Sequence, residues 1–332
     1  MKKKIKIIAE IGVNHNGSIA LAKKMINFAV KAKVDYVKLQ SYITDNLVIQ
    51  NTSLAGYQKK NFKGTQRDLL NKYELNFKEQ VQLFNYCKKK KIGFLSTPFD
   101  NESLNFLKNK IPVIKISSGD LDNIPLLINI AKTKKKIFLS TGMSSDREIE
   151  ISLNELIKNG ISKKKITLLH CHSEYPTSFK DINLNSILYL KEKFKIKVGF
   201  SDHTKGIEAS IAAAALGATV IEKHFTLSKK MNGPDHSSSI DPKELQLLVS
   251  SIRNIEDGMG KFGKFVSKVE KKNKSNVRKS IVALKNIKKG SVLSSNNLTT
   301  KRPGNGISAI RWKSVLGKKA IKDFKKNEKI KI

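Results

Sequence analysis

The sequence predicts an α/β fold: a (β/α)8 TIM barrel followed by a small β-rich domain. Eight short apolar, β-branched runs alternate with helical stretches over about 260 residues, which is the count and the length of a closed barrel. After Gly263 the pattern changes to charged residues, and then to short strands and turns. A doubly wound open sheet is the competing architecture, and the count of eight units favours the barrel.

The predicted strands are rich in Ile, Val, Leu and Phe and are bounded by polar or turn residues. They are Ile5–Ile11, Val34–Gln40, Ile92–Thr97, Pro112–Ser117, Lys136–Thr141, Ile166–Cys171, Ile196–Phe200 and Thr219–Phe225. Between and after them, apolar residues recur every three or four positions, as in amphipathic helices. These helices are Leu21–Ala32, Asn76–Lys90, Ser103–Lys108, Pro125–Lys132, Asp146–Lys158, Ile187–Phe194, Ile207–Leu216 and Lys243–Gly258.

The remaining segments set the domain organisation. The barrel domain is expected at residues 1–265, a charged linker at 266–276, and the second domain at 277–332. The polar stretch from Thr44 to Lys72 is longer than an ordinary connection and could be a functional loop. A domain of about 55 residues is only marginally stable alone, so we expect the second domain to dock on the barrel or on a partner subunit.

The charge is strongly basic. The 332 residues carry 64 Lys plus Arg against 28 Asp plus Glu, a formal net charge of +36. Only six of the basic residues are Arg, and the lysines are spread along the whole chain, which favours a solvated lysine coat over a nucleic-acid site. Such a coat also attracts anionic substrates. Binding to nucleic acid or to an acidic surface is the alternative, but it leaves the polar strand ends described below unexplained.

Other compositional features point to a cytoplasmic protein with a packed core. Hydrophobic residues make up 39% of the chain. The longest nearly uncharged apolar run, Ala209–Ile221, is too short to span a membrane, and the N-terminal residues do not predict a signal peptide. The two cysteines, Cys87 and Cys171, fit a reducing compartment and are expected to be packed thiols.

Polar and ionisable residues stand at the carboxyl ends of all eight predicted strands, which meet at the active-site face of a barrel. The strand-end residues are Glu10; Lys38 and Gln40; Thr97; Lys115 and Ser118; Ser140; Ser173 and Tyr175; Ser201 and His203; and Glu222 and His224. Side-chain alternation puts Glu222 and His224 on one face of their strand and Lys223 on the other. The array predicts a polar site without specifying the reaction.

Two histidines are candidate metal ligands. His203 and His224 end neighbouring strands, and two imidazoles there suit a divalent cation that keeps open positions for water and substrate. With only two protein ligands, such an ion would be loosely held. The alternative is that each ring only hydrogen-bonds a neighbour. His15, His170 and His236 are weaker candidates for ligands.

Lysines and hydroxyls at adjacent strand ends form a candidate anion site. Lys38 and Lys115 supply positive charge, and Ser118, Ser140 and Ser201 supply directional donors. Ordinary turn and helix-cap chemistry explains the hydroxyls equally well. A Schiff-base role is the competing use of either lysine.

Two further motifs lie outside the barrel strands. The glycines of Gly258–Gly263 match the dinucleotide pattern G-x-G-x-x-G, but they follow a helix rather than a strand, so that interpretation fails. In the second domain, Arg302 lies in a Lys-Arg-Pro-Gly-Asn-Gly turn. It is either a surface charge or a group that reaches an anionic ligand in the barrel mouth.

Several motifs of the chain, taken together, resemble those of a known enzyme family. The chain contains AEIGVNHNGS, VKLQ, STPFD, KISSGDLDNIP, STGM, LLHCHSEYPT, GFSDHTKGI, EKHFTLSKKMNGPDHSSSIDPKEL and KRPGNGIS. In this order and spacing, from about Lys4 to Ile330, they resemble the bacterial sialic acid synthase family, which includes N-acetylneuraminate and legionaminic acid synthases. The C-terminal segment is similar to the antifreeze-like (SAF) domain of that family.

The resemblance implies condensation of phosphoenolpyruvate with the open-chain aldehyde of an N-acetylated mannose-type sugar. Carbon 3 of phosphoenolpyruvate attacks the aldehyde, water adds at carbon 2, and phosphate leaves by C–O cleavage. It further implies a divalent metal, Mn²⁺ or Mg²⁺, held by His203 and His224. N-acetylneuraminate is the first expected product, and diacetyllegionaminate, made from 2,4-diacetamido-2,4,6-trideoxymannose, is the alternative.

The resemblance also carries roles to individual residues. Glu10 and Glu222 match family site residues, and Glu10 is the favoured proton-transfer group. Residues matching positions around phosphoenolpyruvate and the product are Lys38, Gln40, Thr97, Lys115, Ser118, Ser140, Tyr175 and Ser201. Asp235 matches a sugar-contacting position, and Arg302 matches an arginine that the SAF domain lends to the other subunit of a domain-swapped dimer.

The chain departs from some family members at two motifs. Ser117–Asp120 reads Ser-Ser-Gly-Asp where some members have Gly-Ser-Gly-Glu. His172 and Ser173 stand where some have Thr-Asn, so Ser173 would contact phosphate with a shorter side chain or through water. These departures put the acceptor sugar, rather than the reaction, in doubt.

Overall fold

The computed structural model describes residues 4–56, 58–60 and 62–332. The chain divides after Gly260 into two compact units.

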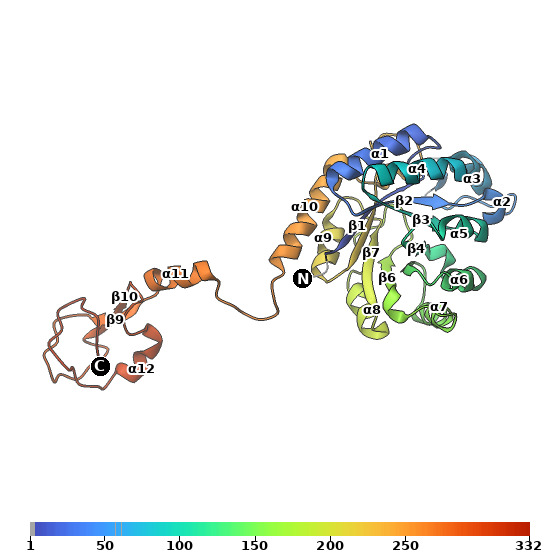
Figure 1. Ribbon diagram of the computed structural model, residues 1–332. Coiled ribbons are helices and arrows are strands. Elements are labelled where there is room, and N and C mark those ends of the chain that lie inside the picture. The colour runs from blue at the N-terminus through green and yellow to red at the C-terminus, as the bar shows by residue number, and fades with distance from the viewer. Residues whose placement is uncertain (1–3, 57, 61) are drawn as a thin grey trace. The chain divides into compact units, whose positions relative to one another are not determined.

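The first unit is a barrel of eight parallel strands (Figure 1). The strands are β1 (Lys6–Gly12), β2 (Tyr36–Ser41), β3 (Gly93–Pro98), β4 (Val113–Ile116), β5 (Lys136–Ser140), β6 (Ile166–Cys171), β7 (Lys197–Asp202) and β8 (Val220–His224). Hydrogen-bonded neighbours run in the order β3-β2-β1-β8-β7-β6-β5-β4, and β3 and β4 lie in contact, so the barrel is nearly closed. The predicted barrel architecture is therefore confirmed.

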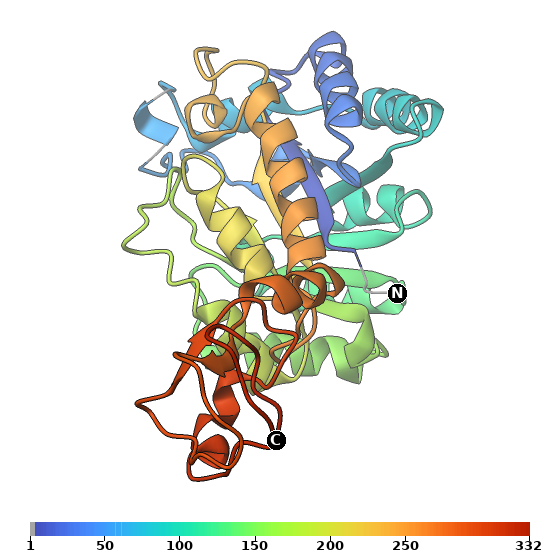
Figure 2. The ribbon, with the colours of Figure 1, turned by 90° about the vertical axis from the view of Figure 1, so that its left-hand side faces the viewer.

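In the described chain, eight helices cover the outside of the barrel. They are α1 (Ile19–Ala32), α4 (Phe77–Lys89), α5 (Asn101–Leu107), α6 (Ile124–Lys132), α7 (Asp146–Lys158), α8 (Ser186–Phe194), α9 (Glu208–Ala215) and α10 (Pro242–Gly258). On the outer surface, α10 packs beside α9 and α1 (Figure 2). Capping boxes begin α4 at Asn76, α7 at Ser145 and α10 at Asp241. Every helix expected between the strands is present, with boundaries that differ by a few residues.

Short helices occupy the connections. They are α2 (Thr44–Leu47), η1 (Gln58–Lys60), α3 (Gln66–Tyr73), η2 (Ser118–Asp120), η3 (Lys163–Lys165) and η4 (His236–Ser238). The polar stretch from Thr44 to Lys72 therefore contains secondary structure of its own. Its longest helix, α3, begins with a capping box in which Thr65 and Asp68 bond each other's backbone N–H groups.

The barrel interior is layered along the strands. An apolar layer fills the lower interior and consists of Ile8, Leu95, Val113, Phe138, Leu169 and Val220. Two residues further along, successive inward positions of the same strands hold Glu10, Thr97, Lys115, Ser140, Cys171 and Glu222. The apolar layer thus closes the barrel beneath a polar layer at the carboxyl ends of the strands.

The second unit contains a two-stranded antiparallel sheet of β9 (Ser280–Ala283) and β10 (Leu298–Lys301). It also contains η5 (Ala309–Arg311) and α12 (Trp312–Val315). Its core is formed by Ile281, Ala283, Ile287, Leu293, Leu298, Val315, Ala320, Phe324 and Ile330.

The segment expected to be a linker, residues 266–276, contains a helix. Residues Lys268–Val277 form a helix, α11, with none of its residues buried. A capping box between Ser267 and Glu270 begins it, and its Lys and Glu residues are good helix formers. The charged composition that indicated a linker is compatible with a solvated helix, and the Ser-x-x-Glu pattern indicates where that helix begins. In the described part of the chain, no helix is long and apolar enough to cross a membrane.

Candidate active site

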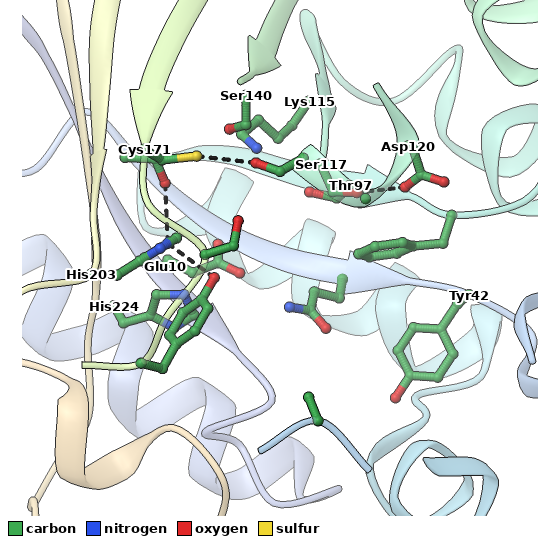
Figure 3. A pocket seen from close by; sticks show the side chains of 18 of the residues that line it. Glu10, Tyr42, Thr97, Lys115, Ser117, Asp120, Ser140, Cys171, His203 and His224 are labelled. Atoms are coloured by element: carbon green, nitrogen blue, oxygen red, sulfur yellow. Dashed lines mark hydrogen bonds between the residues drawn. The ribbon is translucent and has the colours of Figure 1, made fainter. Parts of the chain in front are cut away.

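A cavity of about 470 Å³ opens at the carboxyl ends of the barrel strands. Thirteen of the fifteen sequence-predicted site residues line it: Glu10, Lys38, Gln40, Thr97, Lys115, Ser118, Ser140, Ser173, Tyr175, Ser201, His203, Glu222 and His224. The structure therefore brings together side chains from all eight strands or the loops directly after them. Figure 3 shows Lys115 and Ser140 directed into the same space, with His203 and His224 beside each other.

Four ionisable side chains form the floor of the cavity. Lys38 Nζ lies 2.7 Å from Glu10 Oε2 and 3.8 Å from Glu222 Oε1, and Lys115 Nζ lies 3.9 Å from Glu222 Oε1. All four side chains are at least 95% buried. Buried charges need partners: the Glu222 carboxylate lies near both ammonium groups, and the Glu10 carboxyl group contacts Lys38. A multiply charged anion that enters the cavity meets both ammonium groups.

The two carboxylates differ in their proton affinity. Burial raises the pKa of Glu10 to about 8, although the nearby Lys38 opposes this shift. Glu222 is buried too, but Lys38, Lys115 and a hydrogen bond from Ser201 outweigh burial and lower its pKa. One carboxyl group therefore retains a proton near neutral pH while the other stays ionised, which is the separation that acid–base chemistry needs.

The two lysines are shifted in opposite directions. Burial favours the neutral amine of both, but Glu10 and Glu222 outweigh it at Lys38 and raise that pKa. At Lys115 burial dominates and the pKa is lowered. Lys38 also donates to Thr97 Oγ1 (3.2 Å), and Lys115 donates to the carbonyl of Ile116 (3.1 Å).

Hydroxyl groups surround the lysines. Ser118 Oγ accepts from the Gly142 backbone N–H (3.0 Å) and lies 3.0 Å from Cys171 Sγ. Ser140 Oγ is buried and has no hydrogen-bond partner among the described residues, so it is available to a ligand. A Cβ atom on Gly142 would lie 2.4 Å from Ser173 Oγ, so the backbone must approach this wall closely.

The histidines lie on the side of the cavity formed by β7 and β8. His203 Nδ1 lies 2.5 Å from the carbonyl of His172, so Nδ1 carries the proton and Nε2 is an acceptor. Tyr175 OH lies 3.0 Å from that Nε2, and its ring stacks on His203 with centroids 4.0 Å apart. The His203 and His224 rings have centroids 5.5 Å apart.

These two residues fit the divalent metal that the family resemblance implies. Burial lowers the pKa of His203 to about 4 and that of His224 well below its usual value, so both rings are neutral and carry a lone pair. His224 Nδ1 is buried without a hydrogen-bond partner in the described chain. Within the described residues, no group of three or more His, Cys, Asp or Glu side chains is arranged to hold a metal ion. An ion at this place would therefore depend on two imidazoles and on oxygen ligands from water or substrate.

Two of the predicted site residues do not line the cavity. Asp235 precedes η4, and its Oδ2 lies 3.6 Å from His224 Nδ1. Burial raises the pKa of Asp235 to about 7. Arg302 directly follows β10 in the second unit.

Sequence reasoning missed an apolar wall of the cavity. It is formed by Tyr42, Leu47, Val48, Ala55, Leu70 and Phe99, four of which come from the polar stretch between Thr44 and Lys72. Tyr42 donates to the Leu70 carbonyl (3.1 Å) and packs edge-on against Phe99, across the pocket from His224 (Figure 3). The unusual length of the stretch was the only sequence signal, because its composition is mostly polar.

A nearly closed parallel barrel with buried, paired ionisable groups at the carboxyl ends of its strands defines a TIM-barrel enzyme. Comparison with known proteins gives the family. Residues 25–264 match the NeuB family and residues 278–331 match the SAF domain. The chain belongs to the NeuB family of condensing synthases and carries a C-terminal SAF domain.

Individual relatives are similar over nearly the whole chain. The N,N'-diacetyllegionaminic acid synthase of Campylobacter jejuni is 51% identical, with 99% of each chain covered. The synthase of the same name from Legionella pneumophila is 38% identical over 94% of this chain and 89% of its own. The crystal structure of an N-acetylneuraminic acid synthetase from Leptospira borgpetersenii, in complex with citrate, has a TM-score of 0.73 at 36% identity, covering 81% of this chain and 90% of the other.

Proposed function

We propose that this protein condenses phosphoenolpyruvate with the open-chain aldehyde of an acetamido sugar to give a nine-carbon 2-keto acid and phosphate. The observation that carries the proposal is the buried arrangement of Lys38, Lys115, Glu10 and Glu222 in one cavity with the hydroxyl group of Ser140 and the imidazoles of His203 and His224. Two ammonium groups face the cavity that a multiply charged anion would enter, and the relatives named above are synthases of nine-carbon sugar acids.

The floor of the cavity would bind phosphoenolpyruvate. Lys115 and Lys38 supply charge, while Ser118, Ser140 and Thr97 supply directional donors around them. Glu222, held ionised, keeps both ammonium groups in place and accepts from Ser201. Carbon 3 of the bound enol then forms a bond to the aldehyde carbon, water adds at carbon 2, and the C–O bond to phosphate breaks.

Glu10 would supply a proton to the aldehyde oxygen as that oxygen becomes an alkoxide. Its raised pKa of about 8 leaves the carboxyl group protonated at neutral pH. Lys38 lies 2.7 Å from the same carboxyl group and can stabilise the carboxylate that remains.

His203 and His224 would hold a divalent metal, Mn²⁺ or Mg²⁺. When bound, such an ion supplies Lewis-acid polarisation of a carbonyl oxygen. The backbone carbonyl of His172 fixes the His203 tautomer, and Tyr175 stacks against the ring, so this chain presents Nε2 toward the cavity.

The apolar wall favours a deoxygenated, diacetamido acceptor. Leu47, Val48 and Leu70 present apolar side chains, beside Gln58 and Gln66 of the same stretch, and methyl groups of a 6-deoxy sugar and of acetamides would be buried favourably against them. We therefore place 2,4-diacetamido-2,4,6-trideoxymannose first, which gives diacetyllegionaminate. N-acetylmannosamine, the first expectation from the sequence, becomes the second candidate, supported by the likeness to an N-acetylneuraminic acid synthetase.

We also propose a cytoplasmic homodimer in which the SAF domain of one subunit lends Arg302 to the sugar site of the other. The chemistry of the acceptor supports this role, because a guanidinium group can donate two hydrogen bonds to adjacent oxygens. An Arg302→Ala protein with full activity and unchanged KM for the sugar would contradict it.

The experiment that tests the function measures phosphate release by metal-stripped protein given phosphoenolpyruvate, Mn²⁺ and either sugar. We expect release only when metal and sugar are both present, with the higher kcat/KM for the diacetamido sugar. A His203→Ala variant should lose metal-dependent release. His170→Ala is the matched control, because that ring bonds the Ile182 carbonyl and does not line the cavity. Release without metal or without sugar would contradict the proposed reaction.

A further inference from the structure

A buried ion pair lies directly behind the two histidines. Lys223 Nζ is 3.0 Å from Asp202 Oδ2, and both side chains are at most 1% exposed. Lys223 points away from the cavity, since its neighbours Glu222 and His224 line it. The proposed reaction gives this pair no task. A buried ion pair contributes little to stability compared with apolar side chains of similar volume, so its presence here calls for another physical reason.

The ion pair is connected to the residues that flank His203 in the sequence, Asp202 before it and Thr204 after it. Asp202 Oδ1 accepts from the backbone N–H (2.8 Å) and the hydroxyl (2.7 Å) of Thr204. Asp202 Oδ2 accepts from Ser210 Oγ (2.6 Å) at the start of α9, and Lys223 Nζ donates to the carbonyl of Thr204 (2.5 Å). The residues before and after His203 are therefore both connected to Lys223, which directly precedes His224.

The backbone offers no comparable connection at this point. The parallel pairing of β7 with β8 runs through Phe200–Ile221 and Ser201–Glu222 and ends at Asp202–Lys223. Beyond it, the His203 carbonyl accepts from Thr177 and the His224 carbonyl accepts from Ile240, which belong to different loops. The two histidines thus stand where the strands separate, and the ion pair joins Asp202 and Lys223, the residues that directly precede them.

We infer that Asp202 and Lys223 are positioning residues that hold the His203 and His224 rings in a fixed relative orientation at the edge of the cavity. The inference rests on the proposed metal site, because two ligands can share one ion only if their lone pairs converge. Asp202 and Lys223 do not line the cavity, so they would contact neither the substrate nor the metal. Neutral side chains of similar volume at positions 202 and 223 should preserve the packing but remove the ionic contact between the ends of β7 and β8.

The test uses the full-length protein labelled with ¹³C at histidine Cε1. The chain has six histidines, so each ring gives one resolvable NMR signal. Two variants, Lys223→Met and Asp202→Asn, are compared with the parent. In metal-free protein we expect the His203 and His224 signals to shift or split in both variants, while the His15 and His236 signals stay in place. In a Mn²⁺ titration, the concentration that broadens the two shifted signals should rise on the order of 10-fold.

Arg253→Met provides a matched control. Arg253 pairs with Asp35 (3.1 Å), at the amino-terminal end of the barrel, so its loss removes a largely buried ion pair far from the histidines. This variant should lose thermal stability and leave both histidine signals and Mn²⁺ broadening unchanged. Unchanged His203 and His224 signals in Lys223→Met would overturn the inference. If Mn²⁺ broadens neither signal in the parent, the proposed metal site fails, while the shifts in metal-free variants still decide the positioning role.

Discussion

Replacing Lys115 with methionine tests whether this buried lysine binds an anion; the alternative is that it forms a Schiff base. The substitution keeps the length of the side chain and removes its charge. Lys115 Nζ has one carboxylate oxygen within 4 Å, at 3.9 Å, and is 95% buried, so a bound anion would be its principal partner. Two unit charges about 4 Å apart attract by roughly 4 kcal/mol at an effective dielectric constant of about 20.

The expected loss is somewhat smaller than that attraction. Lys38 remains in the cavity, and Glu222 keeps its contacts with Lys38 and Ser201 after the substitution. A loss of about 2–4 kcal/mol in transition-state stabilisation corresponds to a decrease of about 30- to 1,000-fold in kcat/KM for phosphoenolpyruvate. The assay is initial-rate phosphate release at saturating sugar and metal. Lys136→Met, an exposed lysine that begins β5, is the control and should keep parental kinetics.

Lys115→Arg distinguishes charge from covalent chemistry. Arginine retains the positive charge but cannot form an imine, so it should recover at least about tenfold over the methionine variant if Lys115 binds an anion. Burial lowers the pKa of Lys115, which is also the property of a Schiff-base lysine. An arginine variant as inactive as the methionine variant, together with a borohydride-trapped adduct on Lys115 in the parent, would refute the anion-binding role.

Three further outcomes follow from the geometry. Gly142→Ala places a Cβ 2.4 Å from Ser173 Oγ and 2.8 Å from Ser118 Oγ, so kcat/KM for phosphoenolpyruvate should fall by about 10- to 100-fold; parental kinetics would contradict the close wall. Because Glu10 acts in its acid form and burial raises its pKa to about 8, kcat/KM should decline as pH rises through about 8, and Glu10→Gln should abolish that limb of the pH profile. Phe324→Ala should cost the second unit about 3–5 kcal/mol of unfolding free energy and leave the barrel transition unchanged in calorimetry; one shifted cooperative transition for the whole chain would contradict separate cores.

The sequence predicted side-chain positions best in the strands, where inward-facing and outward-facing residues alternate with a period of two. The polar residues at the strand ends were expected from the sequence, and the structure adds an apolar layer beneath them, with Ile8 two residues before Glu10 and Val113 two residues before Lys115. The same alternation separated Lys223 from its neighbours Glu222 and His224. These inferences need only local geometry, which is why they agree with the structure.

Outside the strands, local sequence patterns predicted the structure less well. A capping box at Ser267 was present in the segment interpreted as a linker, and it begins the helix α11. The apolar wall could not be predicted from the sequence, because Leu47, Val48 and Leu70 are isolated apolar residues in a polar stretch. Only the path of the chain brings them to one side of the cavity.

The sequence by itself determined the order of the elements, the barrel architecture and the residues at the strand ends, because backbone periodicity and turn chemistry depend on near neighbours. Tertiary structure alone decided which groups pair. The opposite pKa shifts of Glu10 and Glu222 depend on Lys38, Lys115 and Ser201, which are distant in the chain. Charge interactions and burial depend on distance in space, and closure of the barrel sets that distance.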